Sequence, residues 1–261
     1  EDVTLQIDVE DPTVGDTYSG LEKVWYTVSA AGNVNTSETI ELLDNSRNRI
    51  QGNKTFSQVI TVPASEYNSN DVKVQAFAQD FSGNKGNSDI TELKIDVTNP
   101  TVSVAWDLNN PSNGKYYKDT RTATVTVTDR NFDANNVRFN ITNTDGTEAN
   151  ISGWSSSSDM GISDSAASTC QVSFPADGDY TFTLGCTDLA GNGGEYGKTD
   201  AFTIDKTNPV LTVSYDNSSA RNGRYFKETR TATVTVREHN FNPADVRTAV
   251  TAALQGCGIS P

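Results

Sequence analysis

Short segments in which hydrophobic and polar residues alternate recur along the whole chain. Residues 122–127 read TATVTV, and residues 102–106 read VSVAW. Such alternation predicts strands that bury one face. Turn-forming Gly, Asn, Asp and Ser residues separate these segments, and no long segment has the 3.6-residue periodicity of a helix. The pattern therefore predicts an all-β chain made of antiparallel β-sandwiches.

The pattern also repeats. Residues 115–132 (KYYKDTRTATVTVTDRNF) and 224–241 (RYFKETRTATVTVREHNF) are identical at 12 of 18 positions, at an interval of 109 residues (224 − 115). The linker at 95–100 returns at 204–209 with the same interval. Two landmarks with one interval predict a tandem array of small domains. We place the modules at residues 1–98, 99–207 and 208–261, the last being the N-terminal half of a third module.

The half module should differ from the complete ones. Val246, Thr248 and Val250 alternate with other residues, so we expect them to form its third strand. Half a sandwich exposes its core face and its unpaired edges. We therefore expect residues 208–261 to be poorly ordered alone or to pair with another chain.

One string in the second module resembles the tyrosine corner of immunoglobulin-like domains. Residues 177–182 read DGDYTF, and in such corners a tyrosine near the start of a strand hydrogen-bonds back to the preceding corner. Tyr180 takes this role. Phe182 stands where antibody domains keep a cysteine, so the antibody disulfide is not expected.

Two cysteines fall in this same module. Cys170 and Cys186 are both predicted to point inward at one end of the sandwich. They are a disulfide candidate, since facing strands can bring two such residues into range. The alternative is that both are small buried hydrophobes.

Composition limits the classes of partner. The chain has a formal net charge of −14, a hydrophobic content of 34% and a mean hydropathy of −0.53. An acidic surface makes nucleic acids and anionic membranes poor partners. No apolar run approaches the 18 or more residues of a membrane span, so no membrane insertion is expected in this segment.

The turns and linkers carry a family resemblance. Residues 188–192 read DLAGN, the looser counterpart at 80–84 reads DFSGN, and the linkers read DVTNP at 96–100 and DKTNP at 205–209. The chain thereby resembles the tandem bacterial immunoglobulin-like (Big-type) repeats of Gram-positive, gut-type cell-surface proteins, whose modules carry D-x-A-G-N turns and D-x-T-x-P linkers. The resemblance implies an extracellular stalk or adhesin segment, on the cell surface or attached to the cell wall. It identifies no ligand.

Catalytic motifs are missing from the sequence. The single histidine, His239, is replaced by Arg130 in the other copy of the repeat, so a role as general base is disfavoured. No G-x-S-x-G, H-E-x-x-H, P-loop or dinucleotide fingerprint occurs. We therefore expect no enzyme and no cofactor, apart from a candidate calcium ion.

Calcium is a candidate because hard cations collect carboxylate and carbonyl oxygens. Each turn and the linker that follows it are expected at one end of their module, where an ion would stiffen the joint. The candidate ligands are Asp80, Asn84, Asp96, Asp188, Asn192 and Asp205. The alternative is that Asp80 and Asp188 accept backbone N–H bonds and cap their turns.

Prolines and aromatic residues complete the picture. Pro100 and Pro209 fix the backbone of linkers that lead directly into the next strand, which predicts a semi-rigid rod. Trp25 and Trp106 are expected in the cores. Trp154 lies beside a serine-rich loop and either packs in the core or contacts a sugar.

These observations together predict a non-catalytic structural or adhesive segment of a bacterial surface protein. It would be a semi-rigid stalk that spaces and presents a functional head, with neighbouring modules as partners and a host or glycan ligand as a further candidate. One alternative is a carbohydrate-binding or linker region of a secreted polysaccharide-degrading enzyme. Another is a self-assembling surface fibre completed by module exchange.

Overall fold

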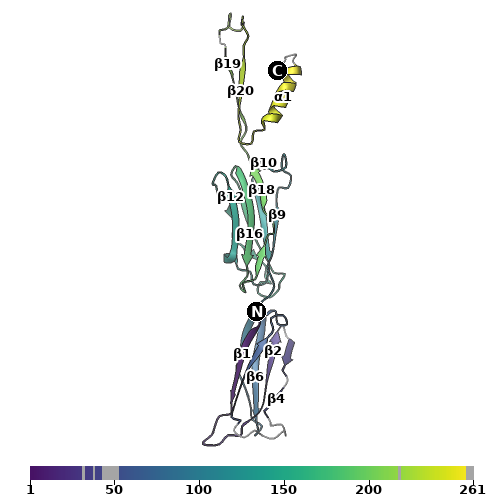
Figure 1. Ribbon diagram of the computed structural model, residues 1–261, viewed down its shortest axis with the longest axis vertical. Coiled ribbons are helices and arrows are strands. Elements are labelled where there is room, and N and C mark those ends of the chain that lie inside the picture. Colours follow the sequence, from purple (N-terminus) through teal and green to yellow (C-terminus); the bar gives the residue numbers. More distant parts are fainter. Residues whose placement is uncertain (31–32, 38, 43–52, 217–218, 257–261) are drawn as a thin grey trace.

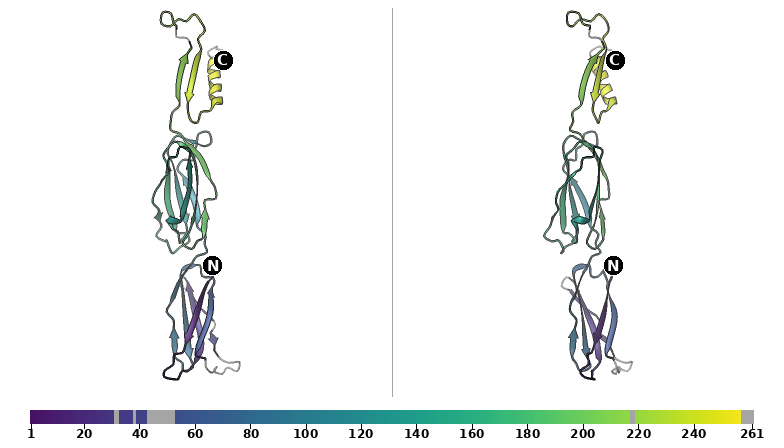
Figure 2. Two further views of the ribbon diagram at one scale, coloured as in Figure 1. Left: turned by 60° about the vertical axis from the view of Figure 1, so that its left-hand side comes forward. Right: turned by 90° about the vertical axis from the view of Figure 1, so that its left-hand side faces the viewer.

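The computed structural model describes residues 1–30, 33–37, 39–42, 53–216 and 219–256. Its elements form three groups that follow one another along the longest axis (Figures 1 and 2). We call residues 3–95 the first sandwich, residues 101–204 the second sandwich and residues 210–256 the C-terminal segment. Each sandwich encloses a hydrophobic core of its own.

The second sandwich has two facing sheets. One sheet has the order β13-β15-β11-β9, with β14 also paired to β15. Its strands are β9 (Thr101–Trp106), β11 (Arg121–Thr128), β13 (Asn150–Ile151), β14 (Ser155–Ser156) and β15 (Ala167–Phe174). The other has the order β10-β18-β16-β12, with β17 also paired to β16. Its strands are β10 (Tyr116–Tyr117), β12 (Val137–Asn143), β16 (Gly178–Thr187), β17 (Gly193–Glu195) and β18 (Asp200–Ile204). All pairs are antiparallel except β10 with β18.

The predicted alternation is confirmed in this core. Ala123, Val125 and Val127 of β11 have no exposed surface, while the intervening threonines are partly exposed. Trp106 packs its ring against Phe174 and other core aromatics, as expected. These alternating side chains place the apolar face of β11 toward the opposite sheet.

Tyr180 forms the predicted corner. Its hydroxyl donates to the Ala176 carbonyl oxygen at 3.0 Å, and its side chain is 2% exposed. A buried hydroxyl needs such an acceptor, because an unsatisfied polar group is costly in a core. The hydrogen bond ties the start of β16 to the corner before it.

Both candidate disulfide partners are free thiols. Cys170 lies on β15 and Cys186 on β16, in facing sheets, and both are buried. The candidate bridge is therefore not formed, and the alternative of two small buried side chains describes them. Burial raises the pKa of the Cys170 thiol to about 11, which keeps it protonated and unreactive.

The first sandwich also has two sheets. One pairs β1 (Val3–Glu10) with β5 (Thr55–Val62). The other has the order β3-β2-β6-β7, with β4 paired to β2 and β8 paired to β6. Its strands are β2 (Leu21–Ala30), β3 (Asn33–Thr36), β4 (Ile40–Glu41), β6 (Ser69–Asp80), β7 (Lys85–Asn87) and β8 (Thr91–Ile95). Valines and isoleucines from both sheets make the core between them.

The pairing shows which strands of the two sandwiches correspond. β1 pairs with β5, which leads into the sheet strand β6, just as β11 pairs with β15, which leads into β16. Strand β1 thus corresponds to β11 and not to β9. The described residues of the first sandwich contain no counterpart of β9.

Trp25 is not in the core, which corrects the prediction. Val24 and Val28 of β2 face the core, and Trp25 lies on the opposite face of the same strand. There it pairs directly with Phe77 of β6, with the rings 5.5 Å apart and 8° from parallel. Trp154, in contrast, packs at the edge of the second core, 4.7 Å from the Phe132 ring.

The C-terminal segment contains β19 (Val210–Tyr215), β20 (Ala232–Arg237) and α1 (Pro243–Gly256). Val246, Thr248 and Val250 lie in α1, so the expected third strand is wrong. Asn242 caps this helix by accepting from the Ala244 N–H at 3.1 Å.

The corresponding segment of the second sandwich also begins with a capped helical turn but continues as a strand. There Asp133 caps the single-turn helix η1 (Ala134–Asn136), after which the chain enters β12 and pairs with β16. The described part of the C-terminal segment holds no counterpart of β16. Its alanine-rich residues 249–253 favour continuation of the helix instead.

The expected exposure of the half module is confirmed. The apolar side chains of β19 and β20 are more than half exposed at four positions of β19 and one of β20: Val210, Leu211, Val213, Tyr215 and Val234. The described residues of this segment supply no second sheet to cover them.

Candidate functional site

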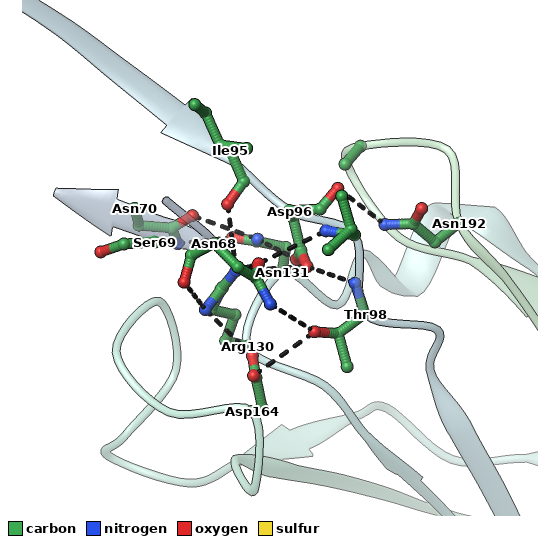
Figure 3. A network of polar contacts seen from close by, with 12 residues as sticks. Asn68, Ser69, Asn70, Ile95, Asp96, Thr98, Arg130, Asn131, Asp164 and Asn192 are labelled. Carbon is green, nitrogen blue, oxygen red and sulfur yellow. Dashed lines mark hydrogen bonds and ion pairs between the residues drawn. The ribbon is translucent and has the colours of Figure 1, made fainter. Parts of the chain in front are cut away.

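The linker between the two sandwiches is surrounded by polar side chains from both. It runs from the end of β8 to the start of β9, between the first strand residues of β6 and the loops that follow β11 and β16. Figure 3 shows the network that these segments form. Four of the eight buried polar or charged residues in the described part of the chain lie at this joint: Asp96, Asp129, Arg130 and Asp188.

Arg130 is the central cation of the joint. It is 6% exposed, and its guanidinium lies 3.2 Å from Asp96 Oδ1 and 3.2 Å from Asp164 Oδ1. It donates to the backbone carbonyls of Asn68 at 3.2 Å and Ile95 at 3.1 Å, and also to the Asn68 side chain. A residue of the second sandwich thus holds the backbone of the first. A buried arginine needs such partners, because an unpaired buried charge is strongly destabilising.

Two asparagines add a reciprocal contact across the joint. Asn70 donates to Asn131 Oδ1 at 2.6 Å, and Asn131 donates to Asn70 Oδ1 at 3.1 Å. Asn131 also donates to Asp96, and Asn70 donates to the Gly161 carbonyl at 3.0 Å. The joint is therefore closed by side chains from three separate segments.

The turn after β16 reaches the linker as well. Asp188 Oδ1 accepts from the Ala190 and Asn192 N–H groups, each at 2.8 Å, and Oδ2 accepts from the Asn192 side chain. Asn192 in turn donates to the Asp96 carbonyl at 3.2 Å. Asp80 accepts from the Asn84 backbone and side chain in the same way. The turn-capping interpretation is confirmed for both aspartates.

Three buried carboxylates meet at the joint. Asp96, Asp129 and Asp188 are 8%, 0% and 3% exposed, and one carboxylate oxygen of each lies within 4.8 Å of the others. Asp129 Oδ1 accepts from the Asn131 N–H at 2.6 Å, but its Oδ2 has no hydrogen-bond partner among the described residues. Desolvation raises the pKa of the Asp129 carboxyl to about 6, and the charges of Asp96, Asp188 and Asp164 act in the same direction.

The structure corrects which predicted ligands lie together. Asp96 follows β8, whose Ile95 pairs with the first residue of β6, whereas Asp80 ends β6. The 12 residues of β6 separate the two aspartates by about 35 Å. Asp80 and Asn84 are therefore not near Asp96.

The same geometry separates Asp188 from Asp205. Asp188 follows the end of β16, while Asp205 follows Ile204, which pairs with Gly178 at the start of β16. Antiparallel strands place these two ends at opposite poles of the sandwich. The turn aspartate thus meets the linker that precedes its own sandwich, with Asn192 beside it.

Asp129 is the member of the cluster that the sequence reasoning missed. A usable signal lies in the repeat, because Asp129 and Asn131 stand at the same positions as Glu238 and Asn240. Asn240 donates to Asp205 Oδ2 at 2.8 Å, the counterpart of the contact between Asn131 and Asp96. The described residues at this second joint contain no counterpart of Asp188.

Comparisons with known proteins do not identify the chain. No family model matches it, and no curated protein matches it. Among solved structures it is similar to dimeric latent PorU from Porphyromonas gingivalis, with 16% sequence identity and a TM-score of 0.29. The match covers 91% of this chain and 24% of that one, so the chain spans about a quarter of its length. A likeness this weak carries no argument about function.

No helix in the described part of the chain is long and apolar enough to cross a membrane. Surface pockets with volumes of about 370–500 Å³ lie among the described residues. The carboxylate cluster at the joint is therefore the described site with the most distinctive chemistry.

Proposed function

We propose that the chain is a non-catalytic structural segment, a semi-rigid spacer that presents a functional head on a bacterial cell surface. As the resemblance to Big-type repeats implies, the proposed spacer is extracellular and also makes adhesive contacts. The acidic, polar surface and the end-to-end order of the sandwiches support it.

The joint is the observation that carries the proposal. Arg130, Asn131 and Asn192 of the second sandwich bond to the first sandwich or to the linker, as described above. Domains joined by a flexible linker move independently unless their interface holds them. Here the contacts are buried or partly buried, and the pair between Asn70 and Asn131 is reciprocal, which restricts the angle between the sandwiches.

Close packing of the linker adds to this restriction. Gly194 on β17 lies directly against Pro100, so that a Cβ atom there would collide with the Pro100 carbonyl. Pro100 itself has a fixed φ angle. The linker is thus held against the second sandwich from its proline onward.

Double electron–electron resonance, which measures the distance between two spin labels, tests the spacer function. Labels at Gln58→Cys and Asn140→Cys, both exposed, would report the distance between the sandwiches, with Cys257→Ser removing a further thiol. We expect one narrow distance distribution, broadened by Arg130→Ala combined with Asn131→Ala. Arg138→Ala is the matched control, because Arg138 is exposed and its side chain donates to the Asn135 and Val137 carbonyls of its own segment. A broad distribution in the unaltered joint, with and without divalent cations, contradicts the proposal.

A carbohydrate-binding role is the second candidate, and one observation favours it. Trp25 and Phe77 form a parallel aromatic pair on the outer face of the β2–β6 sheet. Flat aromatic rings of this kind stack on sugar faces through their apolar surface. Glycan-array binding that is lost in Trp25→Ala distinguishes this function from a purely mechanical one.

A further inference from the structure

The charges at the joint do not balance. Three carboxylates meet in the cluster and Asp164 lies at its edge, while Arg130 is the one cation that the described residues place there. Four carboxyl groups thus face one guanidinium group. Coulomb repulsion among buried carboxylates is strong, because the surroundings screen it poorly.

Asp129 shows where the missing charge belongs. Its side chain is fully buried, and Oδ2 has no donor within the described chain. Buried carboxylate oxygens are normally paired or coordinate a metal. Oδ1 is already used by the Asn131 N–H, so the unpaired oxygen is free to bind a cation beside Asp96 and Asp188.

The spacing of the oxygens fits a hard cation. Calcium binds oxygen ligands at about 2.3–2.6 Å, so two ligands on opposite sides of the ion are about 4.8 Å apart. One oxygen from each carboxylate lies within 4.8 Å of the others. The three side chains supply only oxygen ligands, which suits calcium better than a softer metal.

We propose that Asp96, Asp129 and Asp188 bind a calcium ion at the joint between the two sandwiches. The linker contributes Asp96, while the second sandwich contributes Asp129 from the loop after β11 and Asp188 from the turn after β16. The ion ties the linker to both of these segments. Binding itself does not depend on the spacer function, although it would stiffen the spacer.

Isothermal titration calorimetry on the whole chain, stripped of metals with a chelator, tests the site. We expect one ion per chain at this joint, with a Kd of about 10⁻⁴ to 10⁻³ M as in extracellular modules. Asp129→Asn, which keeps the shape of the side chain, should weaken binding at least about tenfold, because it removes one charged ligand. Asp80→Asn is the matched control, since Asp80 caps the equivalent turn far from the cluster, and it should leave binding unchanged.

Thermal unfolding supplies a second measurement. Calcium at about 10 mM should raise the Tm of the wild-type chain by about 3–10 °C and raise that of Asp129→Asn by clearly less, because the weakened site is less fully occupied. Lack of binding by the wild-type chain at this concentration overturns the proposal, whether or not the variant folds. Equal binding by wild type and Asp129→Asn also overturns it, and tighter binding of magnesium than of calcium overturns the choice of ion.

The two proposals fail in different ways. A chain that binds no calcium but gives a narrow spin-label distance distribution would retain the spacer function and lose the ion site. A chain that binds calcium but shows a broad distribution would retain the site and lose the spacer function.

Discussion

Arg130 and Gly194 shape the joint in opposite ways. Arg130 reaches out of the second sandwich and holds two backbone carbonyls of the first. Gly194 contributes by lacking a side chain, because Pro100 occupies the space that a Cβ atom would need. Neither role is visible in a hydropathy pattern, since both depend on contacts between distant segments.

The close approach at Gly194 gives a residue-scale prediction. Gly194→Ala should destabilise the second sandwich and its linker by about 1–3 kcal/mol, because the added methyl collides with rigid backbone. Gly193→Ala is the matched control, since a Cβ there meets nothing within 4 Å. Its effect should stay within about 0.5 kcal/mol. Urea unfolding followed by tryptophan fluorescence measures both, and equal losses would contradict the assigned contact.

At the scale of elements, the same starting sequence leads to two structures. Asp133 and Asn242 each cap a helical turn. The segment after Asp133 continues as β12, whereas the segment after Asn242 continues as α1. A strand needs a partner, and β12 has one in β16. Helices satisfy their backbone hydrogen bonds internally, so α1 needs none.

The exposed strands of the C-terminal segment predict how it behaves. β19 and β20 pair only with each other in the described structure, and a two-stranded sheet is marginal in water. We therefore expect proteases to cut within residues 210–256 at least about tenfold faster than within the second sandwich. Limited proteolysis followed by mass spectrometry measures this, with sites in 101–204 as the internal control. Similar rates in both regions would show that the segment is covered, for example by a second chain.

At the scale of the molecule, alternation along the chain predicted most of the fold. It identified β11 and the core face of that strand, because one-sided burial imposes a two-residue period. The turn string at 177–182 identified the Tyr180 corner. Alternation gave the wrong element for residues 246–250, where the choice between strand and helix depends on a partner strand elsewhere.

The candidate site was only partly predictable for a related reason. The sequence identified Asp96 and Asp188 as candidate ligands but grouped them with the wrong neighbours, because residues close in the sequence can lie at opposite poles of a sandwich. Asp129 follows a buried strand as a single acidic residue, and the signal for it is its match to Glu238 in the repeat. Only the folded arrangement brings the three carboxylates together.

The carboxylate cluster is shared between a linker and the sandwich that comes after it, and this has an effect on folding. The second sandwich supplies Asp129 and Asp188, while Asp96 is positioned by Ile95 at the end of the first sandwich, so the stability gained there appears only once both neighbours are folded. Such a boundary makes adjacent units cooperative, in the way that nearest-neighbour terms govern linear protein arrays. Cutting the chain within the linker would therefore lower the free energy of unfolding of both halves, although the cut removes no residue from either.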